Sequence, residues 1–161
     1  MKKMLKSKKG FSLVELLIVI AIMGVLAVIA FSMFSGVVAN SRKKADNTQA
    51  GNIQKALVAY MVDTGDSKLE FLKNDEAVKT GSDWTEVVLA LQKSQEVDGE
   101  PYEPFLNPKN GSKPSTSEFK TQWNGHYGYK IDVYPERMNA AVVPATVSGE
   151  GTLKIHTDES E

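Results

Sequence analysis

The feature that most constrains the fold of this chain is an apolar run from Leu16 to Phe31 that contains no polar side chain. After Glu15, the next charged residue is Arg42. As a helix, the 24 residues from Phe11 to Phe34 are about 36 Å long, because each residue adds 1.5 Å. This length covers the ~30 Å hydrocarbon core of a bilayer. The run therefore predicts a membrane-spanning helix.

Two ordinary interpretations compete for this run. A secretory signal ends after about 7–15 apolar residues at a small-residue cleavage site, whereas this run is longer and no compact site closes it. A plain membrane anchor is the second alternative. Glu15 argues against it, because a carboxylate inside a spanning segment costs roughly 2.5–3.5 kcal/mol and by default indicates a function.

The residues around Glu15 carry a resemblance to a known family. Their sequence is Lys8-Lys9-Gly10-Phe11-Ser12-Leu13-Val14-Glu15-Leu16-Leu17. It resembles the type III signal of type IV prepilins and of the pseudopilins of type II secretion, and the resemblance covers roughly Lys8 to Tyr60. In that family a membrane aspartyl peptidase cuts after the glycine and methylates the new first residue. The resemblance implies a cut between Gly10 and Phe11, an N-methylated Phe11, and Glu15 as an assembly residue.

The resemblance also implies a domain organisation. Residues 1–10 would be a cleaved leader, residues 11–38 a transmembrane and fibre-core helix, and residues 39–161 a globular pilin head that includes the outer half of the long helix. In the fibre core, small residues let helices approach closely, and the candidates are Ala21, Gly24, Ala27 and Ala30. Many family members have a proline where this chain has Ser32, and Gly24 and Gly36 are the remaining weak points for local unwinding.

The function that the resemblance implies is polymerisation into a surface filament. A type IV pilus subunit that serves adhesion, motility or biofilm formation is the first reading. A pseudopilin of a type II secretion or competence system is the alternative, and a stand-alone membrane-anchored surface protein is the third. The implied partners are other copies of the chain, other pilins, the prepilin peptidase and methyltransferase, the assembly platform, and membrane lipid before assembly. Glu15 is expected to pair with the terminal amine of Phe11 on an adjacent subunit, because a buried carboxylate is expected to be paired.

Charge and composition limit the membrane orientation and the classes of function that remain. Five lysines in the leader, against Arg42, Lys43 and Lys44 after the apolar run, favour an N-terminus on the cytoplasmic side. Without the leader, 14 basic residues face 20 acidic ones, so no specific nucleic-acid partner is expected. The chain has no cysteine and hence no disulfide. Neither His126 nor His156 lies in a metal or catalytic motif, so we expect a structural protein without a cofactor or a metal, and not an enzyme.

Beyond the span, the helix is expected to continue as an amphipathic segment through Asp63. Its apolar face would contain Ala50, Ile53, Leu57 and either Tyr60 or Met61, because these residues recur at spacings of three and four. Gly65 is suited to a left-handed cap at the end of this helix. A capping box at 83–86 predicts a second helix that ends near Ser94, with a short helical turn before it at Leu69–Leu72.

The last part of the chain changes its periodicity. Residues 97–119 are expected to be loop and turn, because they contain four of the six prolines. Strands are expected at 127–134, 138–143 and 152–157, and short connections favour an antiparallel meander. The predicted fold class is α+β: a pilin-like long N-terminal helix, half of it transmembrane, packed against a small antiparallel β-sheet.

Overall fold

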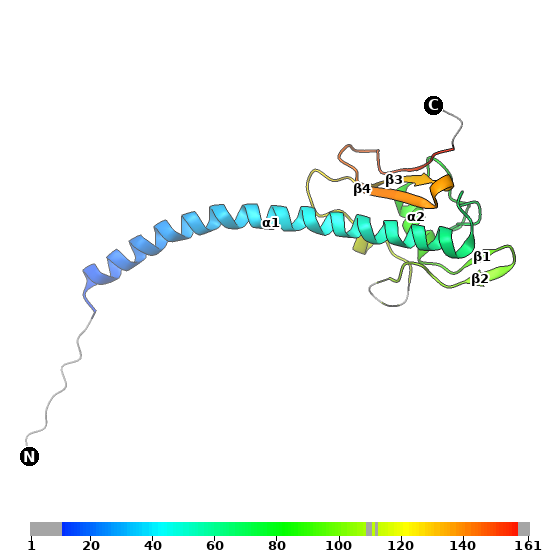
Figure 1. The fold of residues 1–161 in the computed structure, drawn as a ribbon. Helices are drawn as coiled ribbons and strands as arrows, with labels where there is room; N and C mark the ends of the chain where they lie inside the picture. The colour runs from blue at the N-terminus through cyan, green and yellow to red at the C-terminus, as the bar shows by residue number, and fades with distance from the viewer. Residues whose placement is uncertain (1–10, 109–110, 112, 158–161) are drawn as a thin grey trace, which may run out of the picture. The chain divides into compact units, whose positions relative to one another are not determined.

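A computed structural model describes residues 11–108, 111 and 113–157 of the chain (Figure 1). The chain divides into two compact units, with the boundary between Asn40 and Ser41. We call residues 41–161 the head unit. The elements in chain order are α1 (Leu13–Thr64), α2 (Trp84–Leu91), β1 (Gln95–Val97), β2 (Glu100–Tyr102), η1 (Ser117–Phe119), β3 (Tyr129–Tyr134), η2 (Pro135–Arg137), β4 (Asn139–Pro144) and β5 (Leu153–Ile155).

Helix α1 ends one residue beyond the predicted position. Gly65 follows it with a φ of 75°, and its amide donates to the Met61 carbonyl at 3.0 Å. This is the left-handed cap that the sequence predicts. The predicted apolar face of the helix is also confirmed, since these residues are buried: Ala50, Ile53, Leu57, Tyr60 and Met61.

The main sheet has three strands in the order β4-β3-β5. Strands β3 and β4 are antiparallel, with Tyr129 opposite Pro144 and Tyr134 opposite Asn139. Strand β5 pairs with β3 in parallel, so the expected meander is wrong at its last step. The physical reason is visible at the outer edge of β5, where Gly81 and Ser82 exchange backbone hydrogen bonds with Leu153. The segment before α2 thus holds β5 on the far side of β3.

A second departure is the β1–β2 hairpin, which lies partly in the region expected to be loop. Gln95 pairs with Tyr102 and Val97 with Glu100. The turn residues Asp98 and Gly99 have φ values of 52° and 85°. Asp-Gly favours a two-residue hairpin turn, because both turn residues need a positive φ, and this dipeptide was available in the sequence.

Smaller departures occur on either side of α2. No helix forms at Leu69–Leu72; both leucines are buried, and Leu69 takes a left-handed φ of 60°. Helix α2 ends at Leu91, before the expected Ser94, and the Gln95 side chain donates to the Ala90 carbonyl at 2.7 Å. At its start, Asp83 accepts from the Thr85 amide at 2.9 Å.

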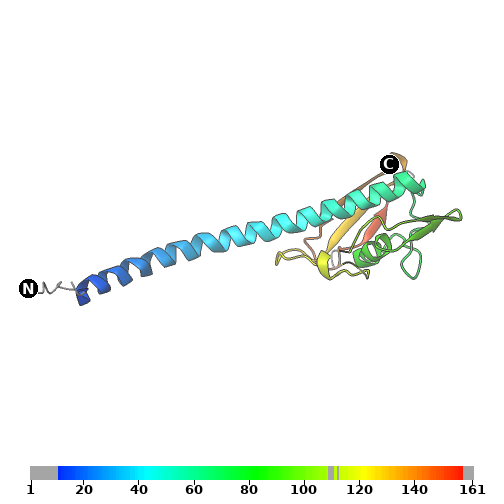
Figure 2. The same ribbon diagram turned by 90° about the horizontal axis from the view of Figure 1, so that it is seen from below.

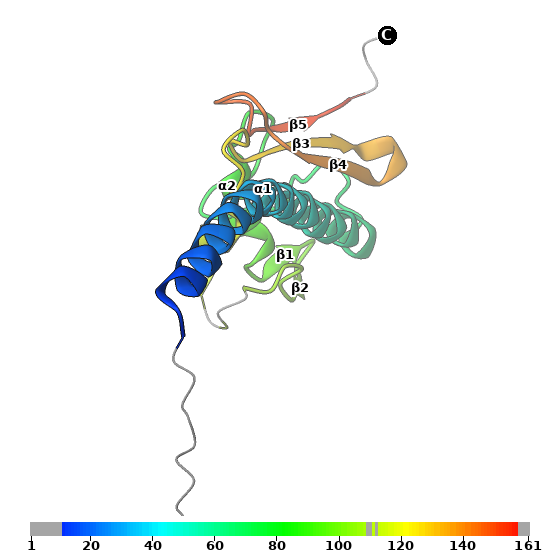
Figure 3. The same cartoon turned by 90° about the vertical axis from the view of Figure 1, so that its left-hand side faces the viewer.

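The hydrophobic core of the head unit joins α1, α2 and the sheet. Its fully buried members include Leu57 of α1, Leu91 of α2 and Ile131 of β3. Figure 2 shows strands β3 and β5 alongside the C-terminal part of α1. In Figure 3 the three-stranded sheet lies on one side of this part of α1 and the β1–β2 hairpin lies on the other. The α+β class and the packing of the long helix against small sheets are therefore confirmed.

Candidate functional site

The N-terminal end of α1 holds Glu15 in a defined position. The Ser12 amide donates to Glu15 Oε2 at 2.9 Å, and the Leu16 amide donates to the Ser12 carbonyl at 3.2 Å. The first contact is one half of a capping box, in which the third helical residue accepts from the cap amide. The pattern Ser-x-x-Glu at 12–15 could have revealed it, and our sequence analysis missed it. Glu15 thus has a partner within its own chain.

The predicted processing site also contains Phe11, which is exposed, and Gly10, which lies outside the described residues. Phe11 is 84% exposed. Gly10 lies outside the described residues, so its position beside Phe11 comes from the sequence alone. The Glu15 carboxylate is turned back toward Ser12, which is the neighbour of Phe11 in the chain. The carboxylate therefore lies close to the residue that a cut after Gly10 would make the N-terminus.

The apolar half of α1 has no cover in this structure. Every residue from Phe11 to Val37 is exposed. By length and composition, α1 can cross a membrane. It continues as a helix through Gly24, Ser32 and Gly36, and the Ser35 hydroxyl donates to the Ser32 carbonyl at 2.9 Å. The free chain therefore shows no break where the family has a proline.

The four small residues proposed for fibre packing lie within this uncovered surface. Their spacing of three does not match the helical repeat of 3.6 residues, so each step turns the position by roughly 60°. They consequently spread over about half of the circumference and do not form one stripe. A Cβ added at Gly24 would meet nothing within 4 Å. The residues concerned are Ala21, Gly24, Ala27 and Ala30.

A buried carboxylate lies where the head unit begins to cover α1. Asp46 is 1% exposed and accepts from the amides of Gln122 and Trp123 at 2.8 and 3.1 Å. Its Oδ2 also lies 2.6 Å from Nδ1 of His126. Three partners on one carboxylate satisfy its buried oxygens. These contacts connect the loop before β3, residues 120–128, to α1.

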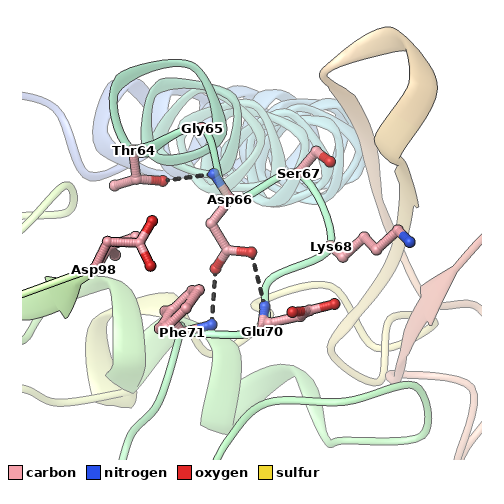
Figure 4. A pocket seen from close by; sticks show the side chains of 9 residues that line it. Thr64, Gly65, Asp66, Ser67, Lys68, Glu70, Phe71 and Asp98 are labelled. Carbon is pink, nitrogen blue, oxygen red and sulfur yellow. Dashed lines mark hydrogen bonds between the residues drawn. The ribbon is translucent and has the colours of Figure 1, made fainter.

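A second carboxylate, that of Asp66, lies just after the C-terminal end of α1 (Figure 4). The Tyr60 hydroxyl donates to Asp66 Oδ2 at 2.6 Å, and the amides of Glu70 and Phe71 donate to Asp66 at 2.8 Å each. Burial raises the pKa of Tyr60 far above its ordinary value, and the hydrogen bond to Asp66 adds to this effect. Asp66 lines a pocket at this turn, but both of its carboxylate oxygens accept hydrogen bonds from its own chain. The cluster stabilises the turn after the helix.

His156 and the β3 tyrosines, Tyr129 and Tyr134, have packing contacts. His156 Nε2 lies 2.9 Å from Asp132 Oδ1, and its ring stacks on Tyr134 with centroids 4.7 Å apart. Tyr129 is fully buried; burial, with the nearby Asp46 charge, raises its pKa well above the ordinary value. Within the described residues, no group of three or more His, Cys, Asp or Glu could hold a metal ion.

Comparison with known proteins places the similarity at the N-terminus. Residues 5–31 match the family described as the prokaryotic N-terminal methylation motif. The chain carries a prokaryotic N-terminal methylation motif. Among curated proteins, a stretch of 61 residues is 34% identical to the type IV major fimbrial protein FimA of Dichelobacter nodosus. A stretch of 58 residues is 44% identical to the fimbrial protein EcpC of Eikenella corrodens.

These alignments have a limited extent. They cover 38% and 36% of this chain, and the chain spans 39% and 38% of those two relatives. No solved structure matches the chain. The resemblance to type IV prepilins is thus confirmed for the N-terminal segment of the chain.

Proposed function

We propose that this chain is made as a precursor and becomes a structural subunit of a type IV pilus. The observation that carries the proposal is the Gly10-Phe11 junction with Glu15 directly before an apolar helix, whose side chains have no cover from Phe11 to Val37. A peptidase would cut after Gly10, and Phe11 would be N-methylated. The subunit would leave the membrane as it joins a helical filament.

The uncovered helix supports this change of surroundings. Before assembly, lipid tails would surround it, and in the filament the same surface would contact the helices of other subunits. Because lipid and neighbouring helices are equally apolar, the transfer changes little hydrophobic free energy, and close packing decides the association. The spread of Ala21, Gly24, Ala27 and Ala30 around the helix fits contacts with more than one neighbour.

Glu15 would guide the register of assembly. Its expected partner is the amine of Phe11 on an adjacent subunit displaced by about one turn. The capping bond from Ser12 refines this idea, because it holds the carboxylate near the N-terminus of its own chain. In the free subunit the helix cap therefore keeps the charge satisfied, and assembly would add the amine of a neighbour. Removing one partner of such a buried pair typically costs about 3–5 kcal/mol.

The proposed location follows from the same features. The precursor would be a single-pass protein of the cell membrane with its N-terminus in the cytoplasm, and the assembled subunit would lie in a filament outside the cell. The peptidase and methyltransferase, the assembly platform and other pilins would be its partners. A pseudopilin of a secretion or competence system is the alternative, and the similarity to fimbrial proteins favours the pilus.

Two measurements test the proposal. Protein from sheared surface material should have the mass of a chain that lacks residues 1–10 and carries one added methyl group. Its N-terminal sequence should begin at N-methylated Phe11. A Gly10→Val variant should accumulate in the membrane with its leader, while a Gly36→Ala control should mature normally, since a Cβ there meets open space. Leader removal in the Gly10→Val variant would contradict the proposal. Imaging separates the alternative, because a pseudopilin would appear in short filaments confined to the cell envelope.

A further inference from the structure

The loop of residues 120–128, which is bonded to Asp46, lies at the end of the head unit where α1 enters it at Ser41. Asp46 is the first buried residue of α1, and its carboxylate accepts from the amides of Gln122 and Trp123. Helical side chains point back toward the N-terminus of their helix and cover the preceding turn. The loop must therefore reach the level of residues 42–45, although it lies more than seventy residues further along the chain.

That preceding turn is basic. Arg42, Lys43 and Lys44 are all exposed, and consecutive helical positions differ by about 100°, so their side chains surround most of the helix. Lys120, the first residue of the loop, is exposed as well. None of these four cations forms an ion pair with any of the residues that the structure describes. These four residues are basic and unpaired among the described residues, whereas the chain as a whole has a negative net charge once its leader is removed.

Trp123 adds an amphipathic side chain to this cationic set. It is half-buried, and its indole folds over Gly125, where an added Cβ would lie 3.0 Å from Nε1. Tryptophan is enriched at the boundary between a membrane and water, because its ring is apolar and its N–H is polar. We call Arg42, Lys43, Lys44, Lys120 and Trp123 the basic collar.

The length of α1 places the basic collar at a definite depth. From Leu13 to Ser41 the helix rises roughly 42 Å at 1.5 Å per residue. A bilayer is about 40–45 Å thick with its headgroup layers. If the apolar half spans the membrane, as the proposed function requires, the basic collar therefore lies in the outer headgroup layer.

We propose that the basic collar binds the phosphates of anionic phospholipids in the outer leaflet before the subunit is assembled. The charge is complementary, and basic residues next to a membrane surface attract anionic lipid. The tertiary structure contributes by bonding the Trp123 amide to Asp46, which brings Trp123 to the end of the basic turn, and Lys120 precedes Trp123 by three residues. The lipid contact would be released when the subunit is extracted from the membrane.

The test uses the full chain in phosphatidylcholine vesicles that contain about one third phosphatidylglycerol, with spin-labelled versions of both lipids as probes. The collar variant is R42Q/K43Q/K44Q. The control variant K68Q/K79Q/K154Q removes the same charge from three other exposed lysines. The preference of the chain for phosphatidylglycerol should fall about five-fold or more in the collar variant and stay unchanged in the control. Leader lysines are present in every variant, so the difference reports on the collar.

Fluorescence gives a second readout of the same contact. A nitroxide in the lipid headgroup should quench Trp123, and the signal of the Trp123→Phe variant, subtracted from that of the wild type, removes the part due to Trp84. No quenching of Trp123, or an equal loss of lipid preference in both triple variants, would overturn the proposal. A collar variant that loses binding to duplex DNA while keeping its lipid preference would overturn it too.

The two proposals fail in different ways. A chain that washes out of the vesicles at alkaline pH does not span the membrane, and the proposed function then falls together with the basic collar. The other case is a chain that stays in the vesicles and a collar variant from which cells still make filaments. If the collar variant then keeps the lipid preference of the wild type, the lipid-binding proposal is wrong and the proposed function stands.

Discussion

Helix α1 has two halves that differ in where they find their packing partners. From Phe11 to Val37 every side chain is exposed, although nearly all of them are apolar. Beyond Ser41 the same helix buries one face, with Ile53 and Leu57 fully covered by the head unit. The outer half therefore has its partner in its own chain. In the proposed pilus, the inner half, residues 11–37, would find its partners first in lipid and then in other subunits.

The largest effect should follow from removing the one charge in the inner half. Glu15→Ala should leave membrane insertion, leader removal and the unfolding of the head unit unchanged, but should reduce filament yield to near zero, since an unpaired amine in the fibre core costs about 3–5 kcal/mol per subunit. Glu15→Asp should be intermediate. Quantifying sheared filaments by immunoblot is the measurement, with the exposed Glu86→Ala as the control. Normal yield from Glu15→Ala cells would remove the pairing role.

The same substitution in the two halves gives the most direct comparison. Leu57→Ala should lower the free energy of unfolding of the head unit by about 2–5 kcal/mol, because it leaves a cavity in a fully packed core. Leu17→Ala, in the uncovered half, should change it by no more than about 0.5 kcal/mol. Denaturant unfolding of the full chain in detergent, followed by tryptophan fluorescence, measures both. Similar losses in the two variants would show that the inner half is packed on the head unit.

Glycines in the head unit provide a smaller but sharper contrast. Gly128 and Gly149 both have a positive φ, 109° and 88°. A Cβ at Gly128 would overlap Nε1 of Trp84, whereas one at Gly149 would meet open space. Gly128→Ala should therefore destabilise the head unit by about 1–3 kcal/mol more than Gly149→Ala, the cost of overpacking. Equal destabilisation in the same unfolding assay would mean that Trp84 moves aside freely.

The smallest effect should appear at alkaline pH and only in the head unit. Tyr60 and Tyr129 have pKa values raised above the ordinary value of 10.0, so the folded state favours their neutral forms. Their contribution to stability is complete below about pH 10 and decreases as the pH rises further, because the unfolded chain ionises first.

Tyr60→Phe tests the alkaline effect. It should cost about 1 kcal/mol at neutral pH, through the lost hydrogen bond to Asp66, and should make the loss of stability between pH 9 and 11 shallower. The exposed Tyr127→Phe should leave the pH profile as it is. A profile that Tyr60→Phe does not alter would assign the alkaline loss to other groups.

Local patterns were enough to predict much of this protein. The apolar run, the Gly10-Phe11 junction and the end of α1 near Gly65 are all readable from the sequence, because each depends on residues within a few positions of one another. The β3–β4 pair follows from alternation and a short turn. Two further local signals were present and missed: the Ser-x-x-Glu cap at residues 12–15, and the Asp98-Gly99 turn of the β1–β2 hairpin.

Other features depended on the tertiary structure. The parallel pairing of β5 could not be read from its own residues, since a short strand has no local preference for either edge of β3; Gly81 and Ser82 select the edge by bonding to Leu153. The fastening of the loop before β3 by Asp46 likewise joins residues that only the folded chain brings together. Periodicity in a sequence determines which face of an element is apolar. Which distant segment covers that face, and which buried charge is satisfied there, is decided by the packing of the whole chain.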